Sequence, residues 1–371
     1  IRDSFYPAGS LEVGIVDLSA LDPAAQEARI AALAAAPIDP MEAVFRATLV
    51  TLGPENAGHL LLLGLHHMAY DGVSIEVLMA EFARLWQAGG VDDLPPPRLH
   101  YADFAVWQRA ALEGGVLAPA LAQQVAALQG APTVLDLPAD RPRPTEPSHA
   151  GAHATVHLPA ALGRALRDLA RAEGASLYMV LEAGLASLLS RLARSEDLLI
   201  GTVLAGRSDA ALERMIGPFF NMAAIRHRIA PAEPFRAVLR AARDAALSVL
   251  DAQMLPFEAL LRDLAPNRDP RRAFSPLFQV LFQLHTETRA TGAAHVDLDG
   301  LRLTLRPGAA GAAYHDLTFD LFEMPDGSVE GRLTYAAELF DAPRIEALIG
   351  HYRALLTALA EDPDCAVGDL P

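Results

Sequence analysis

HLLLLGLHHMAYDGVS, residues 59–74, joins a continuous apolar run to a string of histidine, aspartate and glycine. The apolar run predicts a fully buried strand over residues 59–67, because its length and unbroken apolarity suit a strand covered on both faces. Ser74 is a candidate N-cap for a helix after it. The apolar residues of that helix recur at helical spacing: Ile75, Leu78, Met79, Phe82, Leu85 and Trp86. The string of polar residues is therefore expected where a strand ends and a helix begins.

His67 is the candidate catalytic residue of this stretch. A strand end holds an imidazole rigidly, and an imidazole can take up and return a proton near neutral pH. The loop after it brings Asp71 back toward His67 or toward a nearby arginine, and Gly72 permits a backbone angle or a close approach that a side chain would block. The competing interpretation is a structural one: the two histidines make their hydrogen bonds inside a core, and the aspartate caps a helix.

Composition narrows the classes of protein. A chain of 371 residues with 52% hydrophobic and 20% charged residues predicts a soluble protein of two domains or lobes. The net charge of −16 argues against nucleic acid as a partner. Apolar runs are too short to span a bilayer, and no secretion leader is seen. A single cysteine, Cys365, favours a reducing cytoplasm. Because the first residue is Ile1, we expect a piece of a larger protein.

Strands and helices interleave along the chain, which predicts an α/β fold in two lobes. Residues 137–151 contain four prolines and no periodicity, so we place the inter-lobe linker at 141–151, between lobes of 1–140 and 152–371. Other expected features are a helix start at Asp22-Pro23, a helix ending near Gly174, one starting after Ser176, a strand at 198–204, helical structure over 234–264, a strand at 277–284, a hairpin turn at 325–327 and a last helix over 343–360.

Several segments together resemble one family. His66-His67-Met68-Ala69-Tyr70-Asp71-Gly72 is similar to the His-His-x-x-x-Asp-Gly signature shared by the condensation domains of nonribosomal peptide synthetases and the chloramphenicol acetyltransferase superfamily. Further segments resemble those that accompany it in condensation domains: Tyr101–Gln108, Ile216–Asn221 with Arg226, Gln253 with Pro256–Glu258, Pro276–Gln279, and the short remnant Ile1–Phe5. The resemblance spans nearly the whole chain.

The sequence also departs from the family's pattern. The family's first signature and half of its second are absent, so we expect that roughly the first fifty residues of a complete domain are missing. Phe220-Asn221-Met222 stands in place of Val-Asn-Thr, and Met254 stands where the family generally has aspartate. Tyr70 is bulkier than many residues found before the aspartate, and the late Ser-Arg pair is replaced by Ala273-Phe274. Because the motif's histidines and aspartate are retained, we expect these changes to affect the choice of substrate and the packing more than the activity itself.

The resemblance implies two chloramphenicol-acetyltransferase-like lobes arranged as a V, with His67 midway along a central tunnel. An upstream carrier protein would present an acyl or peptidyl thioester and a downstream carrier an aminoacyl acceptor, each on a phosphopantetheine arm. The product would be an amide bond, made during bacterial natural-product or antibiotic biosynthesis in the cytoplasm. The resemblance also implies an adjacent adenylation domain and no cofactor or metal bound by the domain itself.

The resemblance implies a role for each residue of the site. His67 is a general base or a group that positions the amine and stabilises the tetrahedral species. His66 is a packing and hydrogen-bonding residue, and Asp71 is structural, pairing with an arginine such as Arg2. Gly72 supports the loop. The residues expected to line the substrate tunnel are Tyr70, Ser74, Asn221 and Met222.

Two other functions stay open. A stand-alone acyltransferase with the same signature would use acyl-coenzyme A or a carrier thioester, with an alcohol or amine as acceptor. An inactive platform would recruit carriers or other partners, although its motif would usually be eroded. For carrier docking, Arg191 and Arg194 are candidates, and the competing interpretation is a solvated helix end with arginines near the negative dipole.

Overall fold

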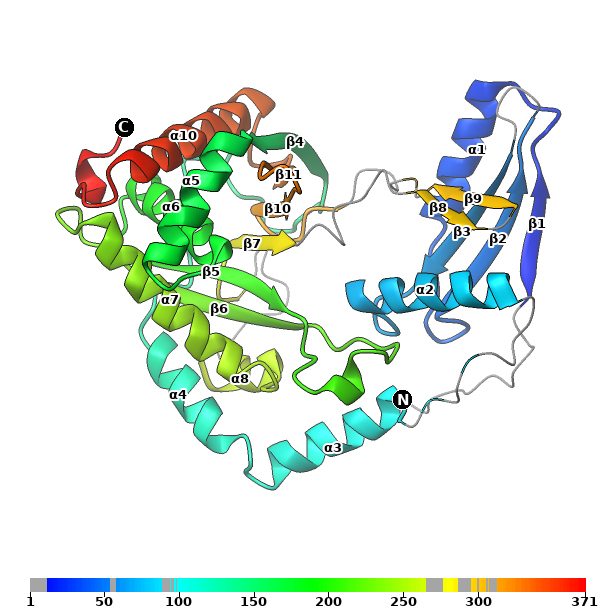
Figure 1. The fold of residues 1–371 in the computed structure, drawn as a ribbon, viewed down its shortest axis with the longest axis horizontal. Helices are drawn as coiled ribbons and strands as arrows, with labels where there is room; N and C mark the ends of the chain where they lie inside the picture. The colour runs from blue at the N-terminus through cyan, green and yellow to red at the C-terminus, as the bar shows by residue number, and fades with distance from the viewer. Residues whose placement is uncertain are drawn as a thin grey trace. The chain divides into compact units, whose positions relative to one another are not determined.

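The computed structural model describes residues 12–53, 58–88, 94, 97, 99–264, 276–285, 295–298, 300–304, 306 and 312–371. The chain divides into two compact units, whose helices and strands are labelled in Figure 1. The first unit consists of Ile1–Ala110, Arg207–Phe220 and His295–Ala309; the second consists of Ala111–Gly206, Asn221–Ala294 and Ala310–Pro371. Both units mix helices with strands, which confirms the predicted α/β class.

The first unit is built on a three-stranded sheet with the order β1-β2-β3. Strand β1 (Val13–Asp17) is parallel to β2 (Phe45–Thr51), which is antiparallel to β3 (His59–Leu65). Helix α1 (Pro23–Ala35) begins at the predicted cap, where the side chain of Asp22 accepts a hydrogen bond from Ala25 N. The helix packs its apolar side against one face of the sheet, and Ile30 and Val50 are buried there.

The prediction that residues 59–67 form a fully buried strand is wrong in its burial. The strand is present as β3, but its exposure alternates, and Leu61 and Leu63 are 42% and 37% exposed. An unbroken apolar run puts apolar side chains on both faces of a strand. Within the described sheet β3 pairs with β2 alone, and α1 packs only with the face that carries Leu60 and Leu62.

The first unit also contains helix α2 (Gly72–Ala88), the short 3-10 helix η3 (Ala210–Leu212), and the hairpin β8 (His295–Leu298) and β9 (Leu301–Thr304). Helix α3 (Tyr101–Glu113) belongs to the first unit up to Ala110 and to the second from Ala111. Helix α2 starts three residues earlier than predicted. Ser74 is not its N-cap, because Asp71 occupies that position and accepts a hydrogen bond from Ser74 N at 2.8 Å.

The second unit holds a six-stranded sheet with the order β4-β11-β10-β7-β5-β6. Its strands are β4 (Gly151–Leu158), β5 (Asp197–Leu204), β6 (Asn221–Arg228), β7 (Val280–His285), β10 (Leu317–Glu323) and β11 (Val329–Ala336). Strand β7 is parallel to both neighbours and the other pairs are antiparallel. The predicted hairpin turn at 325–327 joins β10 to β11, and the predicted strand at 277–284 starts later, at Val280.

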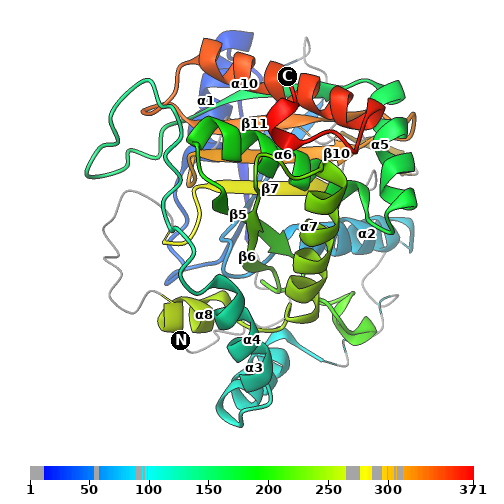
Figure 2. The ribbon, with the colours of Figure 1, turned by 90° about the vertical axis from the view of Figure 1, so that its left-hand side faces the viewer.

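Helices of the second unit are α4 (Ala118–Leu128), α5 (Ala160–Ala172), α6 (Leu177–Ala193), α7 (Phe235–Asp251), α8 (Phe257–Leu264) and α10 (Ala342–Glu361), followed by η4 (Val367–Asp369). Helices α5, α6 and α10 lie together over one face of the sheet (Figure 2). The break between α5 and α6 falls at Gly174 and Ser176, as predicted; Gly174 has a φ of +60°, and Ser176 caps α6 by accepting from Met179 N.

The proline-rich segment 141–151 does not separate the two units. It belongs to the second unit, as do residues 111–140, and so the division differs from the predicted boundaries. Arg141 donates to the carbonyls of Ala337, Glu338 and Phe340, and Arg143 pairs with Asp316. Prolines do exclude regular structure here. Arg141 nevertheless binds the segment to the loop after β11, and Arg143 binds it to the residue just before β10.

Among the described residues, no single helix is long and apolar enough to cross a membrane. Helices α5 and α6 reach the required length and composition only as a pair bent by 102°.

Candidate active site

His67 lies two residues beyond the end of β3. The strand's pairing continues through His66, whose backbone N–H donates to Val44 O at 2.8 Å. His67 Nδ1 lies 2.9 Å from the carbonyl oxygen of Tyr70, while the side chain of His67 is exposed. The turn between strand and helix therefore folds back on the imidazole and fixes one of its nitrogens.

The hydrogen bonds of the two histidines determine their neutral tautomers. A carbonyl oxygen can only accept, so His67 Nδ1 carries the proton that it donates to Tyr70 O, and Nε2 has a free lone pair. His66 shows the reverse arrangement: Met68 N donates to its Nδ1 at 3.3 Å, so the proton of a neutral His66 is on Nε2. Of the two adjacent imidazoles, the one at position 67 presents a basic Nε2.

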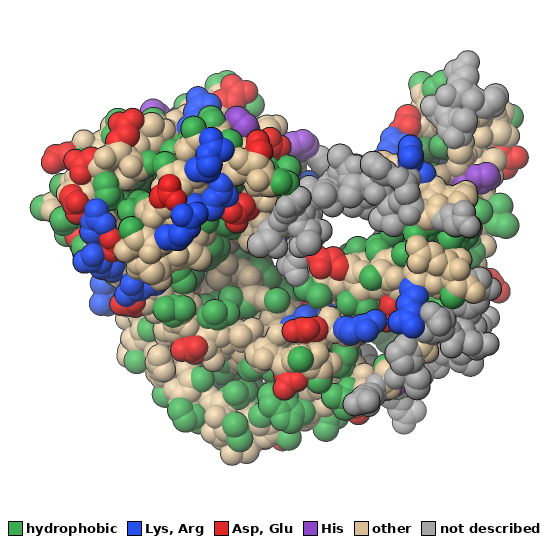
Figure 3. Space-filling view, viewed as in Figure 1, with side chains coloured by type: hydrophobic (Ala, Val, Ile, Leu, Met, Phe, Trp, Pro, Cys, Tyr) green, Lys and Arg blue, Asp and Glu red, His purple; other side chains and the backbone are tan. Residues whose placement is uncertain are grey.

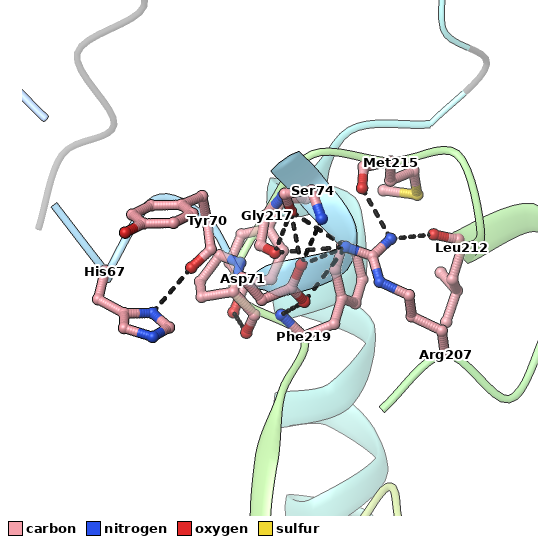
Figure 4. Close-up of polar contacts among 11 residues, drawn as sticks. His67, Tyr70, Asp71, Ser74, Arg207, Leu212, Met215, Gly217 and Phe219 are labelled. Atoms are coloured by element: carbon pink, nitrogen blue, oxygen red, sulfur yellow. Dashed lines mark hydrogen bonds and ion pairs between the residues drawn. The ribbon is translucent and has the colours of Figure 1, made fainter. Parts of the chain in front are cut away.

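Asp71 is held in a buried cluster with Arg207 (Figure 4). Arg207 Nη2 lies 2.9 Å from Asp71 Oδ1 and 3.2 Å from Oδ2, and the two side chains are 4% and 3% exposed. Phe219 N donates to Asp71 Oδ2 at 3.1 Å, and the Arg207 guanidinium stands 4.2 Å from the centroid of the Phe219 ring. The carboxylate thus caps α2 and binds the segment that precedes β6.

Ser74 completes this cluster. Its hydroxyl lies 2.7 Å from Asp71 Oδ1 and 3.0 Å from Gly217 O, and it accepts from Gly217 N at 3.0 Å. A side chain at Gly217 would place Cβ 2.4 Å from the ring of Tyr101, so only glycine fits between that ring and α2. Arg207 also donates to the carbonyls of Leu212 and Met215. The segment 207–220 is therefore attached to the start of α2 by the side chain of Arg207 at one end and by backbone groups of Gly217 and Phe219 near the other.

The predicted pairing of Asp71 with an arginine is present, but the partner that the structure describes is Arg207. Arg2, the arginine named from the sequence, lies outside the described residues. The explanation given for Gly72 is wrong: a Cβ there would meet nothing within 4 Å, and Gly72 is not among the glycines with positive φ. Gly72 serves simply as the first residue of α2.

The four residues predicted to line a tunnel have different surroundings. The Tyr70 ring stacks on the His67 ring with centroids 5.1 Å apart, whereas Ser74 is buried in the Asp71 cluster. Asn221 belongs to the second unit, where it donates to Gln253 O and Leu255 O and accepts from Phe257 N. Met222 packs against a hydrophobic cluster of the same unit. The polar groups of Ser74 and Asn221 are used within the fold, and tunnel lining stays a prediction for all four.

Three residues near the motif were not recognised as parts of the site from sequence. Arg207 lies in no recognisable motif, whereas Gly217 and Phe220 lie in Ile216–Asn221, whose resemblance to the family does not indicate that they are near His67. The Phe220 ring packs against the imidazole of His67 with centroids 4.6 Å apart. Within the described residues, no three His, Cys, Asp or Glu side chains are grouped so that they could hold a metal ion.

Comparison with known proteins shows which family the chain belongs to. The family model described as Condensation domain matches residues 4–371. The chain is a condensation domain. It is 36% identical over 89% of its length to a dimodular nonribosomal peptide synthase of Bacillus subtilis, and 35% identical over 86% to tyrocidine synthase 2 of Brevibacillus parabrevis. It spans only 14% and 9% of the lengths of these two proteins.

Solved structures extend the match to the fold. The X-domain from teicoplanin biosynthesis superposes with a TM-score of 0.88 at 28% identity, covering 99% of this condensation domain and 82% of that chain. The same X-domain in complex with OxyB gives a TM-score of 0.86 at 27% identity, covering 97% and 79%. The two-lobed, chloramphenicol-acetyltransferase-like fold is therefore established for this condensation domain.

The two arginines considered for carrier docking lie at the end of α6. Arg191 Nη1 donates to the carbonyls of Leu370 at 2.6 Å and of Pro371 at 3.1 Å, so its guanidinium fastens the last described residues of the condensation domain. Arg194 adopts a left-handed conformation with a φ of +51° at the C-cap of the helix. Figure 3 shows basic and acidic side chains interspersed over the second unit, in keeping with its many ion pairs.

Proposed function

We propose that this chain catalyses amide bond formation between an upstream carrier-bound acyl or peptidyl thioester and a downstream carrier-bound aminoacyl acceptor. The observation that carries the proposal is the hydrogen bond from His67 Nδ1 to Tyr70 O on an exposed side chain, because in the neutral imidazole it places the lone pair that can accept a proton on Nε2. Membership of the condensation domain family supports the reaction class, since condensation domains are acyltransferases that form amide bonds.

The chemical steps follow from a base at Nε2. The acceptor amine attacks the thioester carbonyl carbon, and His67 Nε2 takes the proton that the nitrogen must lose. The new carbon–nitrogen bond forms a tetrahedral species, the carbon–sulfur bond then breaks, and the leaving sulfur takes the proton back from His67. The donor chain ends on the downstream carrier as an amide, and the upstream arm leaves as a free thiol.

Asp71 has a positioning role in this proposal. All of its contacts to Ser74, Arg207 and Phe219 hold the loop after His67, and none of them requires it to exchange a proton with substrate. A carboxylate that accepts several hydrogen bonds, including those of a guanidinium, is fixed in place. Arg207 and Ser74 support His67 through the same loop.

The partners in this proposal are peptidyl carrier proteins, with an adenylation domain beside the condensation domain in a longer synthetase, in the bacterial cytoplasm. Substrates arrive on phosphopantetheine arms, so the domain's own residues need to bind and orient a thioester and an amine. Bringing two tethered reactants together replaces a bimolecular encounter by a positioned one.

A recruiting function is the second candidate, because the teicoplanin X-domain superposes closely and is known in complex with OxyB.

A direct assay distinguishes amide bond formation from a recruiting function. Donor and acceptor carriers, each loaded on its phosphopantetheine arm, are mixed with the protein, and the acceptor is analysed by mass spectrometry. We expect an acceptor that carries the donor chain, and no comparable product when acyl-coenzyme A replaces the loaded donor. Product from acyl-coenzyme A alone would favour a stand-alone acyltransferase, and binding without product would favour a recruiting platform.

A further inference from the structure

Two aromatic rings pack against the imidazole of His67. The Tyr70 ring is nearly parallel to it, with an interplanar angle of 17° and centroids 5.1 Å apart. The Phe220 ring is tilted by 49° with centroids 4.6 Å apart. Both aromatic residues are half-buried while His67 is exposed. The rings therefore border the imidazole and leave part of it open to a substrate.

The position of Phe220 is set by the residue before it. Phe219 is 4% exposed, its backbone N–H binds Asp71, and its ring meets Tyr101 edge-on at 5.1 Å and Phe104 at 4.8 Å. A residue whose neighbour is fixed by backbone and ring contacts has little freedom to move away. The contacts of Phe219 therefore hold Phe220 in place beside His67.

We propose that Tyr70 and Phe220 restrict the acceptor to aminoacyl groups that are unbranched at the β carbon. This inference rests on the proposed function, in which the acceptor nitrogen loses its proton to His67 Nε2. That nitrogen must come within roughly 3 Å of Nε2, and the β carbon follows only two bonds later, so the side chain starts within roughly 5–6 Å of the imidazole. The centroids of the Tyr70 and Phe220 rings lie 5.1 Å and 4.6 Å from the centroid of the imidazole, so both rings are within reach of such a side chain. A second substituent on the β carbon therefore competes with them for space.

Two separate segments of the chain supply these rings. Tyr70 lies between β3 and α2, and Phe220 directly precedes β6. The two residues lie 150 positions apart, from 70 to 220, yet both rings contact the imidazole of His67. The crowding beside His67 therefore depends on both segments, and the contribution of each ring can be tested by a separate substitution.

The test compares alanyl and valyl acceptors on one downstream carrier, with one donor, in single-turnover reactions. Phe220→Val should raise the ratio of the valyl rate to the alanyl rate about tenfold, because one or two methyl groups in an apolar site change rates by that order. Phe220→Leu should raise it less, and it provides a second variant if Phe220→Val is poorly folded. Tyr70→Leu should act in the same direction, because the backbone carbonyl that binds His67 is kept. Ile216→Val, at a residue 43% exposed in the same segment, should leave the ratio unchanged.

Each outcome tests either the inference about the acceptor or the proposed function. An unchanged ratio in the folded Phe220 and Tyr70 variants overturns the inference, as does a change that follows the donor's bulk and not the acceptor's. Neither result affects the proposed function as long as His67→Ala is inactive with both acceptors. Activity in His67→Ala would overturn the proposed function itself.

Discussion

Asp71 and Arg207, 136 positions apart in the sequence, form a buried ion pair in which Arg207 Nη2 lies 2.9 Å from Asp71 Oδ1. The same carboxylate caps α2 and accepts from Phe219 N. The pair joins the loop after His67 to the segment that ends at Phe220. Both segments that flank the imidazole, the loop after His67 and the segment that ends at Phe220, are therefore held in place by this buried ion pair.

We predict that Asp71→Asn lowers both stability and rate. The amide keeps one acceptor oxygen but turns an N–H group toward Arg207 or Phe219, and it leaves the guanidinium without a counter-charge. Breaking a buried ion pair in this way costs about 3 kcal/mol. Urea unfolding and single-turnover rates measure the two effects.

Asp22→Asn is the matched control for this change. Asp22 is also an N-cap in the first unit, and asparagine caps a helix as well as aspartate does, so its substitution should be nearly neutral. An Asp71→Asn variant that unfolds like the parent yet is inactive would argue for a direct chemical role of Asp71.

Features that depend on neighbouring residues could be predicted from the sequence. The cap at Asp22, the break at Gly174 and Ser176, and the hairpin turn at 325–327 are all found where local turn and capping chemistry indicates them. The motif around His67 also lies between a strand and a helix, as expected. These features need only a few consecutive residues.

Long-range pairing could not be predicted in the same way. All 30 basic residues are arginines, so nothing local distinguishes Arg207 from the others as the partner of Asp71. The prolines of 141–151 indicate irregular structure but not that Arg141 and Arg143 bind it to the second unit. Apolarity alone also overstated the burial of β3, because burial depends on what covers each face.

Substitution by alanine should destabilise the protein at one glycine near the site and be nearly neutral at another. Gly217→Ala places a methyl group 2.4 Å from the Tyr101 ring, and such overpacking costs about 2 kcal/mol. Gly72→Ala meets nothing within 4 Å at the start of α2, so its effect should stay within about 0.5 kcal/mol. Thermal unfolding of the two variants gives the comparison. Equal melting temperatures would show that the ring of Tyr101 moves aside without cost.

Asn221 should prove structural. Its side-chain amide donates to Gln253 O at 3.2 Å and Leu255 O at 2.5 Å and accepts from Phe257 N at 3.1 Å. Asn221→Ala leaves these backbone groups without that partner and should cost about 2 kcal/mol. Asn221→Asp should also destabilise, because a carboxylate cannot donate to the two carbonyls. A loss of rate at unchanged stability would instead place Asn221 in contact with substrate.

Glu173 should make the second unit sensitive to acid. Hydrogen bonds from Arg236 and from Arg240 hold the pKa of Glu173 below its ordinary value of 4.5. A carboxylate whose pKa is lower in the folded state contributes stability above its unfolded pKa, and this contribution is lost as the pH falls through the folded value. Glu173→Gln should therefore destabilise the protein more at pH 7 than at about pH 3.

Asp168→Asn is the control for this prediction. Asp168 pairs with Arg171 at a distance of 2.8 Å, but the two side chains are 68% and 75% exposed, and exposed pairs contribute little. Its urea unfolding should match that of the parent at both pH values. A Glu173→Gln effect of the same size at both pH values would contradict the account of the Arg236 and Arg240 contacts.

The proposed acyl transfer depends on His67, whose Nε2 takes up and returns the proton. The most direct measurement is single-turnover condensation between loaded donor and acceptor carriers, with His67→Ala and His66→Ala compared side by side. The tautomers inferred from Tyr70 O and Met68 N predict a loss of at least about a hundredfold for His67→Ala and a much smaller loss for His66→Ala, with both variants unfolding like the parent. Near-normal condensation by a folded His67→Ala protein would contradict the claim.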